Sequence, residues 1–483
     1  MSNHLINLSK NPSAVFQIQI SSNDQVENLR SDFIQSVVEK HPFGNLVSSQ
    51  NQLEANRVKI ESEIPLSFSV YYPKLFPQET IKLLYVELDP GVDDGAALLQ
   101  ILAALSRKAG KKVELVGVAP SVGNAVLSQT EKNTLQFLEL TNFKNVKAYP
   151  GAVAPLAIEN NQTAINEMEK AINATHFYGH DGESDVGGWP KIAMQMQNTP
   201  GYKYAADQIS AASAEAPLTL VSTSALTELA KTLNELELRD SQAGLPAGSF
   251  AKNINAISIM GGCLSRSAGC NAPFDVPDNQ KYSEANFYFD APAAQKVFAI
   301  CEKYGIPILL APLDLTQQPG LLWTKDQVKM LEQIDNPVSR QMARVTNVVP
   351  YLDQPCFPNG TYPMHDLQAV TNFLFYNLYK VIRSAVSIGD KGQMMIDVNV
   401  PDTRKNVYLF QMGLEEQKNY YPTVLAEYAN FQLSHKARHS TIDKTIAIFS
   451  GILSVSIGWA VLTFWTLKKC CIKRVELEGV LQV

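Results

Sequence analysis

The sequence predicts an α/β protein with an open, mostly parallel, Rossmann-like sheet and one transmembrane helix near the C-terminus. Three observations support this fold class. Short apolar runs end in Gly, Pro, Ser, Thr or Asp, helical stretches lie between several of these runs, and a long uncharged span follows the last of them. Strands that are apolar on both faces are typical of parallel sheets covered by helices on each side.

Five apolar runs are the predicted strands, and two stretches between them are predicted crossover helices. The runs are "IKLLYVEL" (81–88), "KKVELVGVAP" (111–120), "APLTLVSTS" (216–224), "INAISIMGG" (254–262) and "GIPILLAPLD" (305–314). The helical stretches are "DGAALLQILAALSRKAG" (94–110) and "SQTEKNTLQFLELT" (128–141). In open sheets of this kind, ligands bind outside the carboxyl ends of the strands. We therefore expect a site in the loops that follow the runs.

The chain divides into five predicted segments. Composition changes from polar and poorly periodic to strand-rich near residue 81, and from globular to connector-like near residue 420. The predicted segments are an N-terminal extension (1–80), an α/β domain (81–420), a connector (421–444), a transmembrane helix (445–467) and a short tail (468–483).

The predicted membrane span is "TIAIFSGILSVSIGWAVLTFWTL", residues 445–467. It has about 23 residues without a formal charge, which at about 1.5 Å per residue is enough to cross a bilayer core of about 30 Å. Trp459 and Trp465 near its end, followed by Lys468 and Lys469, resemble an interfacial belt and a charged stop. A buried core helix is the alternative. The span predicts contact with membrane lipid, and the flanking charges leave its orientation open.

The N-terminal sequence and the overall composition limit the expected cellular location and the expected binding partners. The first residues, "MSNHLINLSKNPSAVFQIQI", lack the basic start and apolar core of a secretory signal, so secretion is not expected. Their Ser/Asn-rich composition leaves a mitochondrial membrane as one candidate. The formal net charge is -6, with 41 basic and 47 acidic side chains, which gives no electrostatic case for binding nucleic acid. Six cysteines without CxxC spacing predict reduced thiols rather than a disulfide framework or a zinc site.

The first predicted strand ends in an acidic loop. Asp89, Asp93 and Asp94 lie within six residues, and Gly91 between them permits a tight turn. Their mutual repulsion is tolerable if a hard cation binds, because Ca²⁺ and Mg²⁺ select oxygen ligands. The alternative is a solvated turn that caps the next helix, where Asp is also favoured.

This loop, "ELDPGVDD" (87–94), resembles the D-x-D-P-G-x-D-D signature of the inosine/uridine-preferring nucleoside hydrolases, which are calcium-dependent N-ribosidases. Further segments of that family recur in the right order. They are "GVAPSVGNAVLSQTEKN" (117–133), "YPGAVAPL" (149–156), "LVSTSALTELA" (220–230), "IMGGC" (259–263), "SEANFYFDAPAA" (283–294) and "YPMHDLQAV" (362–370). The resemblance implies an open sheet of the nucleoside hydrolase type and hydrolysis of ribonucleosides to free base and ribose.

The resemblance also implies the residues of the site. Calcium would be held by Asp89, Asp94, the carbonyl of Thr223 and Asp366, together with a water. The ribonucleoside would be bound by Asp93, Asn124, Met260, Asn271, Glu284, Asn286 and Asp366. Catalysis would use Asp89, which accepts the proton of the attacking water, and His365, which protonates the departing base or donates a hydrogen bond to it.

Several of these residues have a plainer interpretation when the family is set aside. A lone His beside an Asp is often a satisfied structural pair, Met260 suits a core position, and Asn124 after Gly123 suits a turn. Four residues also depart from the family pattern: Glu87 replaces the first Asp of the signature, Ser224 and Glu228 stand where Gly and Asn are usual, and Tyr178 in "HFYGHDGES" takes a His position.

Two hypotheses follow. The first is a membrane-anchored calcium-dependent nucleoside hydrolase, for which the family resemblance implies a homo-oligomer. The second is a weakly active or non-catalytic relative that serves as an accessory subunit of a membrane protein complex, which the four departures and the membrane span favour.

Overall fold

The computed structural model describes most of the α/β domain, namely residues 82–105, 113–143, 145–175, 179–181, 183, 185–264, 270–273, 280–347 and 361–435. The predicted N-terminal extension, membrane span and tail lie outside these residues, as does Tyr178. Within the described part, no helix combines the length and the apolar composition that a membrane crossing requires.

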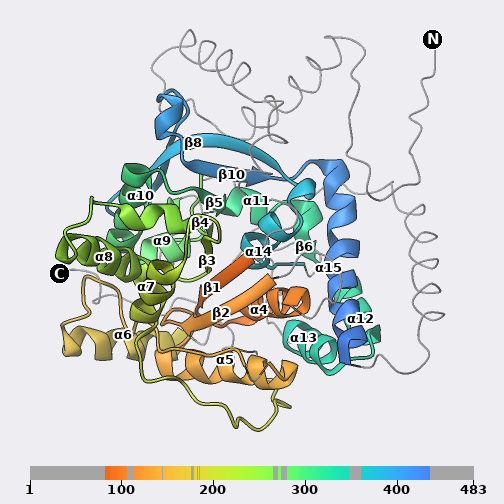
Figure 1. Cartoon of the computed structure of the whole chain (residues 1–483). Coiled ribbons are helices and arrows are strands. Elements are labelled where there is room, and N and C mark those ends of the chain that lie inside the picture. Colours follow the sequence, from red (N-terminus) through yellow and green to blue (C-terminus); the bar gives the residue numbers. More distant parts are fainter. Residues whose placement is uncertain are drawn as a thin grey trace, which may run out of the picture. The chain divides into compact units, whose positions relative to one another are not determined.

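An eight-stranded sheet runs through the described part of the chain (Figure 1). Its order is β2-β1-β3-β4-β5-β10-β8-β9, and neighbouring strands from β2 to β10 are parallel. The predicted mostly parallel sheet is confirmed, because the five apolar runs supply five of its strands: β1 (Lys82–Leu88), β2 (Val113–Pro120), β3 (Leu218–Ser222), β4 (Ile254–Met260) and β5 (Ile308–Ala311).

The strands on the other side of β5 are not predicted from the sequence. There β10 (Val407–Gln411) is parallel to β5, whereas β8 (Lys380–Ile388) is antiparallel to β10, and β9 (Met394–Asp397) is antiparallel to β8. A separate pair joins the short strands β6 (Leu322–Trp323) and β7 (Tyr362–Pro363). The β6–β7 pair leads the chain to His365 and Asp366, two of the predicted site residues.

Helices cover both faces of the sheet (Figure 1). Alternate residues of a strand face opposite sides. Accordingly, Val86 and Leu88 pack with α4, α5, α13, α14 and α15, while Tyr85 packs with α7, α8 and α10. The helices are α4 (Val92–Leu105), α5 (Leu127–Thr141), α6 (Gln162–Thr175), α7 (Gly201–Ala211), α8 (Thr227–Gln242), α9 (Ala285–Phe289), α10 (Ala291–Tyr304), α11 (Leu313–Thr316), α12 (Lys325–Gln333), α13 (Pro337–Asn347), α14 (Leu367–Leu374) and α15 (Leu414–His435).

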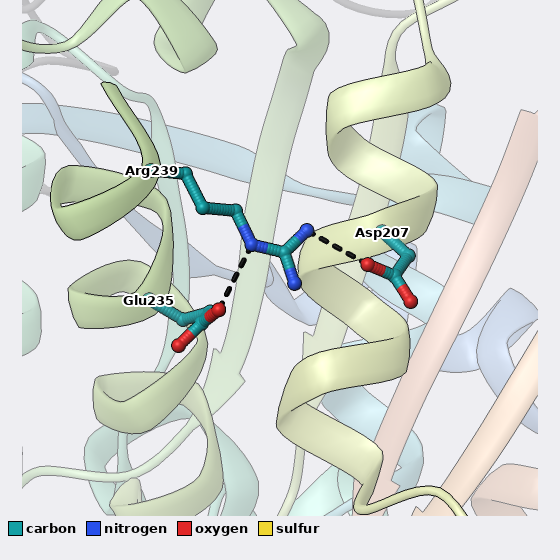
Figure 2. Close-up of polar contacts among 3 residues, drawn as sticks. All are labelled: Asp207, Glu235 and Arg239. Carbon is teal, nitrogen blue, oxygen red and sulfur yellow. Dashed lines mark hydrogen bonds and ion pairs between the residues drawn. The ribbon is translucent and has the colours of Figure 1, made fainter. Parts of the chain in front are cut away.

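Helices α7 and α8 are joined at their outer surface by Arg239 (Figure 2). Its Nη1 lies 2.8 Å from Asp207 Oδ1 on α7, and its Nε lies 2.9 Å from Glu235 Oε1 on α8. Exposed ion pairs of this kind contribute about 1 kcal/mol or less. These helices are therefore held on the sheet mainly by the buried hydrophobic cluster to which Ala205 of α7 and Leu229 of α8 belong.

Helix α15 continues beyond the predicted end of the domain at residue 420. Residues 421–435, assigned from the sequence to the connector, are the last 15 of its 22 residues. Tyr428 in this part is fully buried, and its hydroxyl donates to the carbonyl of Ala96 in α4 at 3.0 Å. Up to at least Tyr428, the helix packs on the α/β domain.

Candidate active site

The acidic loop occupies the junction between β1 and α4. Asp89 follows the last residue of β1, and Asp93 and Asp94 lie in the first turn of α4, where the helix dipole favours negative charge. All three carboxylates are buried, with exposed fractions of at most 4%. The backbone N–H groups of Asp89 and Gly91 donate to the two oxygens of Asp94, at 3.3 and 3.2 Å. The turn that Gly91 permits thus fixes the orientation of Asp94.

Asp366 joins these carboxylates from a distant part of the chain. It precedes α14, and one oxygen from each of Asp93, Asp94 and Asp366 lies within 4.8 Å of the other two. Asp89 is not in this group. Its Oδ2 accepts the backbone N–H of Asn124 at 2.7 Å, while its buried Oδ1 has no hydrogen-bond partner among the described residues. Asp89 as a metal ligand therefore stays a prediction.

Burial and mutual repulsion set the electrostatics of this cluster. Burial raises the pKa of Asp89 well above its ordinary value, and the negative charge of Asp94 adds to the effect. The pKa of Asp366 is also raised well above the ordinary value, by burial and then by Asp93, Asp94 and Asp89. A cation bound among these oxygens would instead lower the pKa values of Asp89 and Asp366, because it favours the ionised carboxylates. Buried carboxylates and an unpartnered Oδ1 are a suitable donor set for calcium, which binds six to eight oxygens.

Two uncharged side chains donate hydrogen bonds to the acidic loop. The hydroxyl of Thr223, just after β3, donates to Asp94 Oδ1 at 2.6 Å. Asn124 Nδ2 donates to Asp94 Oδ2 at 3.0 Å and to the carbonyl of Asp89 at 3.1 Å. These groups lie together because parallel strands β1, β2 and β3 end at the same edge of the sheet.

The predicted ribose residues border the cluster through Thr223. Asn286 Nδ2 donates to the Thr223 carbonyl at 3.0 Å and lies 3.6 Å from the Sδ of Met260, at the end of β4. Glu284 is the N-cap of α9 and accepts the N–H groups of Gly262, Asn286 and Phe287 at 2.8 to 3.1 Å. Burial raises the pKa of Glu284 to about 7, although these donors lower it.

Asn271 and His365 approach the site in different ways. Asn271 Oδ1 accepts the N–H of Ala285 at 2.8 Å, so this side chain supports the start of α9. A direct contact with ribose stays a prediction. His365 Nδ1 lies 2.7 Å from the hydroxyl of Thr316 in α11. Burial lowers the pKa of His365, which Asp93 partly offsets, and this favours the neutral imidazole at pH 7.

Glu183 is a further buried residue near the site that no sequence pattern predicts. Its carboxyl is fully buried, and neither oxygen has a hydrogen-bond partner among the described residues. Burial raises the pKa of Glu183 well above its ordinary value, with further contributions from Asp181, Asp94 and Asp93. Asn133 Nδ2 ties this segment to the acidic loop by donating to the carbonyls of Asp181, at 2.8 Å, and Pro90, at 3.0 Å. Nothing in the polar stretch "GHDGES" indicates that its Glu is buried.

The family model for inosine-uridine preferring nucleoside hydrolases matches residues 84–420 of this chain. The chain belongs to this family. As a member it is an enzyme of the class that hydrolyses ribonucleosides. Its site residues lie inside the matched range, whereas the predicted membrane span lies beyond it.

Relatives and solved structures agree with the family. Pyrimidine-specific ribonucleoside hydrolases RihA from Klebsiella pneumoniae and from a Shewanella species are each 27% identical to it, over 66% of this chain and 88% and 86% of theirs. The fold is similar to that of a purine-preferring ribonucleoside hydrolase from Gardnerella vaginalis, with a TM-score of 0.56, 21% identity, and coverage of 72% of this chain and 99% of that one. A plant nucleoside hydrolase gives the same TM-score and coverage at 18% identity.

Two of the departures from the family pattern are coupled in this nucleoside hydrolase. Glu87 on β1 and Glu228 in the first turn of α8 are both buried, and the negative charge of Glu228 is, after burial, the main cause that raises the pKa of Glu87. Burial raises the pKa of Glu228 to about 7, against a smaller opposing effect of Lys231. The two carboxyls lie on the α7 and α8 side of the sheet. Ser224, a third departure, is buried after β3.

The nucleoside hydrolase also contains a disulfide, between Cys263 and Cys270, with a Cα–Cα distance of 5.6 Å. The prediction of reduced thiols is wrong for this pair, because the fold brings the two cysteines, seven positions apart in the sequence and without CxxC spacing, within disulfide distance. Cys301 in α10 is a free, buried thiol.

We expect Glu228→Gln to change how stability depends on pH. The pKa of Glu228 is about 7 in the folded protein and 4.5 without burial. Between these values folding takes up a proton, so this carboxyl makes the wild-type free energy of unfolding fall as pH rises towards 7. The variant lacks this pH dependence. The free energy of unfolding of the variant minus that of wild type should therefore increase by up to about 3 kcal/mol from pH 5 to pH 8. Urea denaturation across that range measures the difference. A difference that stays constant with pH contradicts the assignment.

Proposed function

We propose that this protein is a calcium-dependent, membrane-anchored ribonucleoside hydrolase that cleaves the N-glycosidic bond to give free base and ribose. The observation that carries the proposal is the convergence of Asp93, Asp94 and Asp366, beside Glu284 and Asn286, at the carboxyl edge of the sheet. Family membership gives the reaction class. The calcium dependence, the residue roles and the membrane anchor are our inferences.

The cation would be held by Asp94, Asp366, the Thr223 carbonyl and Asp89, the set that the family resemblance implies. The donor set supports this assignment, because hard oxygen ligands suit calcium and the buried carboxylates need a positive charge. When bound, calcium supplies that charge and makes a neighbouring water more acidic.

Asp89 is our candidate for the general base. Its Oδ1 is buried and lacks a hydrogen-bond partner in the described part of the chain, so one oxygen remains for a proton while Oδ2 is held by Asn124. The proton would come from the water that attacks the anomeric carbon. As positive charge develops on the ribosyl group, the carboxylates of Asp93 and Glu284 and the Oδ1 of Asn286 would stabilise it.

His365 is our candidate for the group that assists departure of the base. Because the Thr316 hydroxyl engages Nδ1, we assign Nε2 to the base. The lowered pKa of His365 favours the neutral ring at pH 7, which can still donate a hydrogen bond from one nitrogen. The base preference is not assigned, because named relatives include both pyrimidine-specific and purine-preferring enzymes.

Asp94→Ala should abolish hydrolysis. Incubation of the full-length protein with inosine, uridine and adenosine should release ribose in the presence of calcium and not in the presence of a chelator. The variant should lose at least about 100-fold in kcat/KM, the scale of removing one preorganised electrostatic partner. Asp207→Ala is the matched control, because this Asp contacts Arg239 on the outer surface of α7 (Figure 2). Release that is unaffected by chelator and by Asp94→Ala would contradict the calcium proposal, and no release from any nucleoside would contradict the activity.

The membrane anchor rests on residues 445–467, which lie outside the described residues. We expect the full-length protein to sediment with membranes and to resist extraction by alkaline carbonate, because an uncharged helix of this length inserts stably. Recovery of intact protein in the carbonate supernatant would reject the anchor. A homo-oligomer, subunits of a membrane complex and a mitochondrial location stay predictions that the same membrane preparation can test after gentle solubilisation.

A further inference from the structure

The Cys263–Cys270 disulfide lies next to Gly262 and Asn271. Both residues contact the predicted ribose segment, residues 283–286. Cys263 follows Gly262 just beyond the end of β4, and Cys270 directly precedes Asn271. Both cysteines are buried, with exposed fractions of 3% and 5%. The crosslink therefore connects two stretches of backbone inside the protein, rather than two points on its surface.

The first stretch contacts the ribose segment through Glu284. The N–H of Gly262 donates to Glu284 Oε2 at 3.1 Å. The same oxygen accepts the N–H of Phe287 at 3.1 Å, and Oε1 accepts the N–H of Asn286 at 2.8 Å. Gly262, one residue from the disulfide, thus fixes the carboxylate that caps α9.

The second stretch contacts the same segment through Asn271 and Ala272. Asn271 Oδ1 accepts the N–H of Ala285 at 2.8 Å. The backbone N–H groups of Asn271 and Ala272 both donate to the carbonyl of Ser283, at 3.1 and 3.0 Å. Residues adjoining the two cysteines therefore bind Ser283, Glu284 and Ala285 in succession, and Asn286 follows directly.

We propose that the Cys263–Cys270 disulfide is a positioning crosslink for the ribose-binding segment, and that its reduction weakens nucleoside binding. The inference rests on the proposed function, since it takes Glu284 and Asn286 as ribose contacts. Reduction by a dithiol breaks the Sγ–Sγ bond, transfers two electrons and two protons to give two thiols, and oxidises the dithiol to its own disulfide.

The effect follows from the small size of α9. This helix has five residues and is too short to hold its own geometry in water. Besides the packing of buried Phe287, its orientation depends on the hydrogen bonds from residues 262 and 271–272 and on the bond from Asn286 to Thr223. Without the crosslink, the two cysteines are free to separate, so the groups that hold Glu284 and Asn286 lose their fixed spacing. The proposed calcium ligands lie on other elements, so their spacing should not change when the disulfide is lost.

Kinetics of the double variant Cys263→Ala/Cys270→Ala test the proposal. We expect KM for the best nucleoside to rise about 10-fold with kcat within about two-fold, because contacts that bind substrate and transition state equally affect mainly KM. Calcium affinity should be unchanged. Cys301→Ala, which removes a buried thiol that forms no disulfide, is the matched control and should leave KM unchanged. An unchanged KM in the double variant overturns the proposal, as does alkylation with mass spectrometry that finds both thiols free in the purified wild type.

Hydrogen exchange separates this proposal from the proposed function. Amides of residues 285–289 should exchange faster in the double variant, and in wild type treated with dithiothreitol, than in untreated wild type or Cys301→Ala. Faster exchange without the disulfide, together with a wild type that hydrolyses no nucleoside, would reject the hydrolase proposal and support the positioning role of the crosslink. Equal exchange rates in all samples would overturn the positioning role even if the wild type hydrolyses nucleosides.

Discussion

The active site depends on the repulsion among buried carboxylates. Asp89, Asp93, Asp94 and Asp366 are each at most 4% exposed, and after burial the negative charges of their neighbours raise the pKa values of Asp89 and Asp366 further. Such a cluster costs free energy unless protons or a cation neutralise it. The surrounding groups are donors that suit ionised carboxylates: the hydroxyl of Thr223, the amide of Asn124 and the N–H groups at the start of α4. We interpret the cluster as built for a divalent ion, whose charge also makes water reactive beside a ribose.

The fold supplies this convergence from residues that are far apart in the sequence. Parallel strands β1, β3 and β4 end at one edge, which places Asp89, Thr223 and Met260 together, and α9 and α14 bring Asn286 and Asp366 to the same edge. The rigid sheet fixes the cation side of the site. The ribose side rests on short α9 and on Gly262 and Asn271 beside the disulfide, so the two sides are held by different means.

Sequence patterns predicted the parts of this molecule that follow simple periodicity. Runs such as residues 81–88 are mostly apolar because both faces of their strands are covered by helices. Strand β8, "KVIRSAVSI", was missed because it interleaves polar residues on an antiparallel side of the sheet. The burial of Glu183, the coupling of Glu87 with Glu228 and the pairing of Cys263 with Cys270 depend on tertiary contacts that no local pattern records.

The central claim is that Asp89, Asp94 and Asp366 bind one divalent cation. A crystal structure of the protein grown with calcium measures this most directly. The account predicts a density peak about 2.3 to 2.6 Å from oxygens of Asp94 and Asp366, with Asn124 turned away from the ion. Carboxyl groups that hydrogen-bond to one another as protonated pairs, with no peak between them at saturating calcium, would contradict it.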